Sequence, residues 1–159
     1  MAKLKVYLET SVISYLTALP SRDLIRAAHQ DLTHEWWQRR DRFDLYASEA
    51  VLEEAAAGHP DPATRRLAAL DGCTIVAIDA RVVNLARALL EADALPAKAI
   101  VDALHVAATA VHGIEYLLTW NCKHIANAMM RGIIEKTCRD AGFEPPIICT
   151  PEELTEEQT

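Results

Sequence analysis

The segment Lys3-Leu-Lys-Val-Tyr-Leu-Glu-Thr-Ser11 is the first of several short β-strand patterns in this chain. Up to Leu8 its apolar residues alternate with lysines and a tyrosine, which is the period of a strand. Glu9, Thr10 and Ser11 follow at the carboxyl end of that strand. In α/β proteins, ligands gather outside the carboxyl ends of the strands, so these three polar residues are candidates for a site.

Helical and strand patterns alternate along the rest of the sequence. Further strands are predicted over residues 45–47, 73–78, 116–119 and 146–149. Helices are predicted over residues 23–42, 48–57, 62–70, 81–90, 99–111 and 126–141. Strands separated by helices predict an α/β fold with a largely parallel central sheet.

The spacing of apolar residues predicts which helix faces are turned to the core. In the first predicted helix, which the segment Ser21-Arg22-Asp23 could cap, this face consists of Ile25, Ala28, Leu32 and Trp36. In the helix over 81–90 it consists of Val82, Leu85, Ala86 and Leu89. In the helix over 99–111 it consists of Ile100, Ala103, Leu104, Ala107 and Val111.

Length and composition indicate one globular domain. The chain has 159 residues, of which 51% are hydrophobic, and this is enough for a core. We predict a single domain over residues 1–150 and an acidic, flexible tail over residues 151–159. No apolar run is long enough for a transmembrane helix and no signal-peptide core is present, so we expect a cytoplasmic protein.

Charge and cysteine content narrow the function classes. The net charge of -7 argues against a generic nucleic-acid coat, although it does not exclude a local nucleic-acid site. The cysteines contain no CxxC pair, so a zinc ribbon or thioredoxin-like motif is not supported. We expect reduced thiols at Cys73, Cys122, Cys138 and Cys149.

Oxygen-bearing side chains from distant positions should meet at the carboxyl edge of the sheet. They are Glu9, Glu53 or Glu54, Asp102 and Asn121. Clustered carboxylates repel one another unless a cation neutralises them, and oxygen ligands suit Mg²⁺ or Mn²⁺. Taken singly, Glu9 could be a solvated loop charge, Glu53 and Glu54 could favour a helix dipole, and Asn121 could be a turn residue. Asp102 is harder to explain in this way because it lies in an apolar stretch.

Four motifs in order resemble those of the PIN-domain nucleases. They are Glu9-Thr-Ser11, Ser48-Glu-Ala-Val-Leu-Glu-Glu54 followed by Gly58, Asp102-Ala-Leu-His-Val-Ala-Ala108, and Leu117-Leu-Thr-Trp-Asn121-Cys-Lys-His124. Their order and spacing hold from Lys3 to about Cys149, which is nearly the whole chain. The compact size is most similar to the VapC-type toxins of bacterial toxin–antitoxin pairs.

The resemblance implies a Mg²⁺- or Mn²⁺-dependent endoribonuclease on a three-layer α/β/α sandwich. It implies that Glu9, Glu54 and Asp102 hold the metal and that Asn121 completes the catalytic set, by binding the metal or by orienting a water. A water on the metal would attack the RNA phosphodiester in line. The resemblance also implies that Thr10, Ser11 and Thr119 orient the carboxylates. Glu53 would take the place of Glu54 if the second motif starts one residue earlier.

The same resemblance suggests partners. Basic residues that could contact RNA phosphate are Arg22, Arg26 and Lys123, although single basic residues on helices are usually surface charges. An antitoxin protein is expected, and the helix from Asp23 to Arg42 could border a homodimer or antitoxin contact. His105 could bond to Asp102 or pack in the core, and no recognisable zinc pattern includes it or His124.

The first motif departs from the family, which has Asp where this chain has Glu9. The longer side chain keeps its charge and oxygen ligation, so we interpret the site as reshaped rather than inactive. The alternative is a degenerate PIN domain that binds RNA or a protein partner without cutting. A phosphatase or another α/β hydrolase is not supported, because neither GxSxG nor Asp-x-Asp is present.

Overall fold

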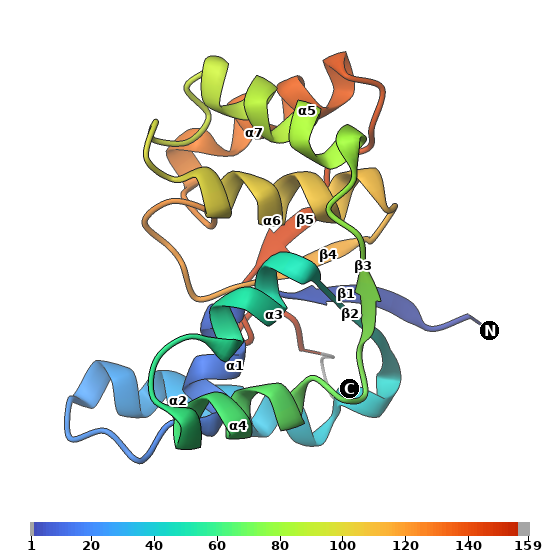
Figure 1. Ribbon diagram of the computed structural model, residues 1–159. Coiled ribbons are helices and arrows are strands. Elements are labelled where there is room, and N and C mark those ends of the chain that lie inside the picture. The colour runs from blue at the N-terminus through green and yellow to red at the C-terminus, as the bar shows by residue number, and fades with distance from the viewer. Residues whose placement is uncertain (1, 156–159) are drawn as a thin grey trace.

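The computed structural model describes residues 2–155 and contains a five-stranded parallel sheet (Figure 1). The strands are β1 (Leu4–Leu8), β2 (Phe43–Ser48), β3 (Thr74–Val76), β4 (Tyr116–Leu118) and β5 (Ile147–Cys149), in the order β3-β2-β1-β4-β5. The helices are α1 (Thr10–Thr17), α2 (Leu24–Gln38), α3 (Glu49–Ala56), α4 (Pro60–Ala69), α5 (Ala80–Glu91), α6 (Ile100–Val111) and α7 (Ala128–Asp140). A short 3₁₀ helix, η1, spans Arg40–Arg42.

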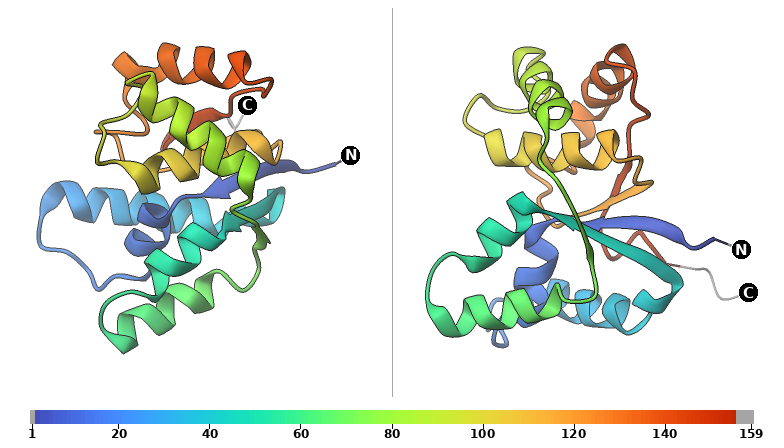
Figure 2. Two further views of the ribbon diagram at one scale, coloured as in Figure 1. Left: turned by 45° about the horizontal axis from the view of Figure 1, so that its top comes forward. Right: turned by 45° about the vertical axis from the view of Figure 1, so that its right-hand side comes forward.

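The helices form two layers on opposite faces of the sheet (Figures 1 and 2). One layer contains α1 to α4, and the other contains α5, α6 and α7. The two layers also contact each other where α3 meets α6. The predicted three-layer α/β/α sandwich with a parallel sheet is therefore confirmed.

The central strand β1 lies between β2 and β4 and is covered on both faces. Val6, Tyr7 and Leu8 have no exposed surface, and Tyr7 is paired with Tyr46 of β2. The alternation in this segment suggested one apolar and one polar face, which is not what the fold shows. Because parallel sheets carry helices on both faces, even Tyr7 is buried.

Side-chain caps explain why several helices begin where they do. Asp23 and Ser48 cap α2 and α3 by accepting hydrogen bonds from Arg26 N and Ala50 N, as predicted. Helix α1 was not predicted from the sequence, and its N-cap is Glu9, whose side chain accepts a hydrogen bond from Ser11 N. The polypeptide therefore turns from β1 directly into a helix at the first candidate site residue.

Three predicted core positions are wrong, two in α2 and one in α6. Ile25 is 69% exposed and Ala28 is also exposed, while the buried residues of α2 are Gln30, Thr33 and Trp36. The N-terminal turns of α2 project beyond the sheet, so only its second half packs against the core (Figure 1). Ile100 is 56% exposed because it opens α6 at the rim of the domain, and burial in that helix begins at Ala103.

The predicted face of α5 is confirmed in full, since all four of its residues are buried. The four cysteines form no disulfide. Of the predicted tail, residues 156–159 lie outside the described part of the chain, whereas Leu154 packs against the core. Within residues 2–155, no helix is both long and apolar enough to cross a membrane.

Candidate functional site

Glu9 lies between β1 and α1 and is only 5% exposed. Its Oε2 accepts a hydrogen bond from Ser11 N at 2.9 Å, and its Oε1 accepts hydrogen bonds from Ser11 Oγ and Thr119 Oγ1 at 2.5 Å each. Its position at the N-terminus of α1 further favours a negative charge. Glu9 is thus a fixed, buried carboxylate and not a solvated loop charge.

Glu54 reaches the same region from the second turn of α3. Its Oε1 accepts hydrogen bonds from Thr10 Oγ1 and from the ring of His105, both at 2.6 Å. Partial burial raises the pKa of Glu54, but the hydrogen bonds from His105 and Thr10 outweigh that effect and leave the pKa below its ordinary value. Among the described residues, no donor bonds to Oε2, so this oxygen is available to a ligand.

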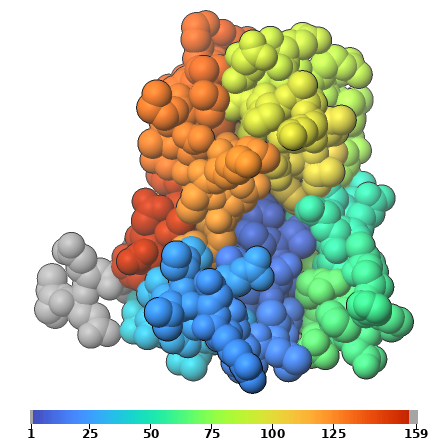
Figure 3. All heavy atoms as spheres, turned by 90° about the vertical axis from the view of Figure 1, so that its left-hand side faces the viewer, coloured from blue at the N-terminus to red at the C-terminus, as the bar shows by residue number. Residues whose placement is uncertain are grey.

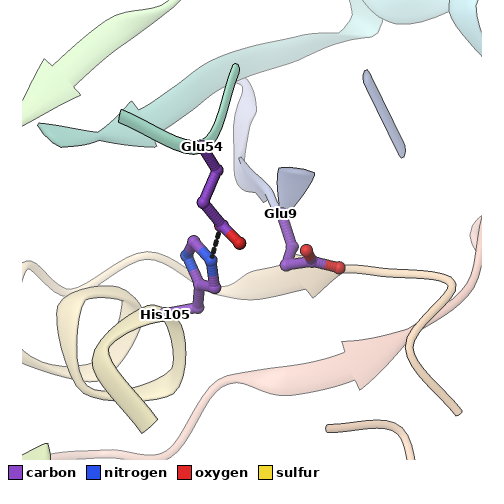
Figure 4. Close-up of side chains that lie close together, drawn as sticks. All are labelled: Glu9, Glu54 and His105. Atoms are coloured by element: carbon purple, nitrogen blue, oxygen red, sulfur yellow. Dashed lines mark hydrogen bonds and ion pairs between the residues drawn. The ribbon is translucent and has the colours of Figure 1, made fainter. Parts of the chain in front are cut away.

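Glu9, Glu54 and His105 form a group that fits a cation (Figure 4). One ligand atom from each lies within 4.8 Å of the others. Figure 4 shows that Glu54 and His105 meet tip to tip and that the Glu9 carboxylate lies beside them. Two carboxylates this close repel each other, and a divalent cation with a preference for oxygen ligands would remove that repulsion.

His105 connects this group to the interior of the sheet. The ring has no exposed surface, and Nδ1 lies 2.8 Å from the hydroxyl of Tyr7. The tyrosine hydroxyl in turn lies 2.7 Å from Ser48 Oγ. Sequence reasoning gave His105 no contact with Glu54, and the structure does not join it to Asp102. Its position in an apolar helix was the available signal, but its partner comes from α3.

Asp102 lies in the first turn of α6 and is not part of the group of three. Its Oδ2 is 2.9 Å from Nδ1 of His124, and both side chains are partly exposed. Asn121 stabilises the loop that carries this histidine, because its Oδ1 accepts a hydrogen bond from His124 N at 3.1 Å. Asn121 N donates to Thr119 Oγ1 at 2.9 Å, so Thr119 links this loop to Glu9.

The remaining predicted residues divide between the site and the surface. Thr10, Ser11 and Thr119 each donate to one of the two clustered carboxylates. Glu53 is exposed and lies outside the group, so the structure places Glu54 and not its neighbour at the site. The catalytic roles of Thr10, Ser11 and Thr119 stay predictions.

Of the basic residues, Arg26 lines a groove of about 490 Å³ that also contains Ser11 and Tyr15. Lys123 borders a smaller hollow together with His124. Arg22 is exposed and lines neither of them. In the view of Figure 3, α1 and α2 at the lower centre lie directly beneath the segment that follows β4.

Trp120 was not singled out in the sequence, although it lies beside the site. Its backbone N–H donates to Ser11 Oγ at 2.8 Å, and its ring nitrogen donates to Thr33 Oγ1 at 2.8 Å. The indole stacks on His29 with the ring centres 4.0 Å apart. Trp120 therefore fixes the end of β4 against α1 and α2.

The sheet order, the two helical layers and the acidic group at the carboxyl edge define a PIN-like α/β/α sandwich. A solved structure with this fold is the crystal structure of VapBC2 from Rickettsia felis bound to a DNA fragment from their promoter. The similarity has a TM-score of 0.58 at 15% sequence identity, and it covers 91% of this chain and 97% of that one. Neither the family models nor the curated protein sequences gave a match. At this identity, the similarity establishes a shared fold.

Proposed function

We propose that this protein is a divalent-metal-dependent endoribonuclease and the toxin of a toxin–antitoxin pair. The observation that carries the proposal is the pair of carboxylates, Glu9 and Glu54, at the carboxyl edge of a PIN-like sheet. Support also comes from the four sequence motifs, since residues of all four lie at this edge. The structural similarity to VapBC2 supports an antitoxin as the partner.

In this proposal Glu9 and Glu54 hold Mg²⁺ or Mn²⁺. When bound, the ion would activate a water for attack on the phosphodiester and neutralise charge on the phosphate. Thr119 and Ser11 hold the Glu9 carboxylate, and Thr10 holds that of Glu54, so both groups stay fixed while RNA binds. Asp102, the third predicted ligand, would add a further negative charge, and it is oriented by His124 and, through the backbone of His124, by Asn121.

Metal binding should raise the melting temperature of the wild type. A ligand present at ten times its dissociation constant stabilises the native state by about 1.4 kcal/mol, which corresponds to roughly 4 °C for a domain of this size. Thermal melts with Mn²⁺ and with chelator measure this shift, and the Glu54→Gln and Asp102→Asn variants should show less of it. An equal shift in the wild type and both variants would place the metal elsewhere.

Cleavage is tested with purified protein and a mixed panel of single-stranded and structured RNAs. The wild type should cut at least one RNA when Mg²⁺ or Mn²⁺ is present, and chelator should stop the reaction. Binding without cutting over the whole panel would instead support the degenerate-binder alternative.

We further propose a homodimer. Apolar side chains at the start of α2 are strongly exposed, with Leu24 at 87% and Ile25 at 69%, and the preceding Leu19 is 79% exposed. Light scattering should give twice the chain mass of 17.6 kDa, and Ile25→Lys should lower it. A wild-type mass equal to that of one chain would contradict this prediction without affecting the fold.

A further inference from the structure

A chain of buried hydrogen bonds reaches Glu54 from the interior of the sheet. Ser48 at the end of β2 contacts Tyr7 in β1, Tyr7 contacts Nδ1 of His105 in α6, and Nε2 of His105 contacts Glu54 Oε1. The three inner residues, Ser48, Tyr7 and His105, have no exposed surface. Bulk water therefore does not reach these three residues, and each of their polar hydrogens needs an acceptor in the protein.

The available donors and acceptors determine the direction in which each hydrogen bond of this series is donated. Ser48 Oγ accepts a hydrogen bond from Ala50 N at 3.2 Å, and its own proton is directed to the oxygen of Tyr7. The tyrosine oxygen accepts that proton, so its own single hydroxyl proton is left to donate to Nδ1 of His105. A neutral imidazole that accepts at Nδ1 carries its proton on Nε2, and this proton is donated to Glu54.

The reverse direction leaves groups without partners. If Nδ1 donated to Tyr7, the tyrosine would donate to Ser48, and the proton of Ser48 would have no acceptor among the described residues. In the neutral ring, the lone pair of Nε2 would also face a carboxylate oxygen at 2.6 Å. Buried unpaired polar groups cost free energy, and two facing acceptors repel each other. The first direction satisfies every polar hydrogen in the chain.

We propose that His105 is a positioning residue that donates from Nε2 to Glu54, and that it is not a ligand of the metal. This inference rests on the proposed function only in assigning Glu54 to a metal site. Because Thr10 and His105 both bond to Oε1, the carboxylate is held in place and Oε2 would remain free to bind the ion. Hard cations prefer oxygen ligands, which agrees with a histidine that supports a ligand instead of acting as one.

Nuclear magnetic resonance of ¹⁵N-histidine-labelled wild type tests the proton assignment directly. The signals of His105 among the six histidines are identified by their loss in His105→Gln. In metal-free protein, Nδ1 should resonate as an unprotonated nitrogen and Nε2 as a protonated one, and saturating Mg²⁺ should leave this pattern unchanged. Protonated Nδ1 in the metal-free protein, or loss of the Nε2 proton on adding Mg²⁺, would overturn the proposal.

A second test uses two tyrosines that are neighbours across β1 and β2. Tyr7→Phe removes the hydroxyl that donates to His105, whereas Tyr46→Phe removes one with no hydrogen-bond partner among the described residues. Titration calorimetry with Mn²⁺ should show affinity weakened about ten-fold or more by Tyr7→Phe and unchanged by Tyr46→Phe. Equal affinity in the two variants would overturn the positioning role.

The outcomes also separate this inference from the proposed function. Absence of Mn²⁺ binding in the wild type would contradict both the metal site and the role of His105 in it. Metal binding and the expected histidine pattern without any RNA cleavage would leave the positioning role supported and contradict only the nuclease assignment.

Discussion

Replacing Glu54 by glutamine should reduce the rate of RNA cleavage by at least about a hundred-fold. Loss of a residue that only supports a metal ligand already lowers metal affinity or activity by about 10- to 100-fold, and Glu54 is proposed as a ligand itself. The substitution keeps the side-chain volume and removes the charge that balances the cation. The Oε1 position can still accept hydrogen bonds from Thr10 and His105, so the fold should be retained. Single-turnover cleavage rates at saturating Mn²⁺ measure the effect.

Glu53→Gln is the matched control. It changes the adjacent residue of the same helix in the same way, but that side chain lies outside the acidic group. Its cleavage rate should remain within about two-fold of the wild type, as surface changes usually have small effects. If Glu53→Gln were the inactive variant, the second motif would start one residue earlier than the structure indicates.

The strands were predictable because each is a short apolar segment bounded by turn or cap residues. All five were expected near their observed positions, and so were the caps at Asp23 and Ser48. Helix α1 escaped prediction for two physical reasons. It has only eight residues, so its apolar period is hardly repeated, and its N-cap is Glu9 instead of the short polar residues that signal a helix start.

Periodicity gives the direction of an apolar face but not the position of a helix along the sheet. The face predicted for α2 fails at Ile25 because the helix extends beyond the core. In α6 the same pattern fails at Ile100, in the exposed first turn, whereas the rest of the predicted face is buried or, at Leu104, partly buried. These errors concern the ends of correctly predicted helices, where tertiary packing and not the local pattern sets burial.

The sequence predicted which residues lie at the site, but not the contacts between side chains from different helices and loops. Glu9 and Glu54 were expected at the carboxyl edge, and the structure brings them together. The contact between Glu54 and His105 depends on how α3 packs against α6, and residues 51 positions apart carry no local signal of it. The pairing of Asp102 with His124 likewise depends on the loop after β4.

Glu9→Gln should abolish cleavage while preserving the fold. The Ser11 and Thr119 hydroxyls each accept one backbone N–H, from Trp120 and Asn121, and can rotate to accept a further hydrogen bond from the new amide. The variant should therefore melt close to the wild type in chelator, and it should lose the Mn²⁺-dependent shift. RNA binding should survive better than cleavage, because phosphate contacts come largely from basic side chains.

Glu9→Asp separates a reshaped nuclease from a degenerate binder. Asp restores the residue usual in PIN nucleases but withdraws the carboxylate by one methylene. The oxygens of Glu9 accept hydrogen bonds from Ser11 and, across the sheet, from Thr119 of the β4 loop, and the shorter side chain cannot keep these contacts and its place beside Glu54. In a site built for glutamate, Glu9→Asp should thus lower the cleavage rate at least about ten-fold, since small displacements of catalytic groups are costly. An inactive wild type that gains cleavage on this substitution would instead identify a binder whose site has lost its nuclease geometry.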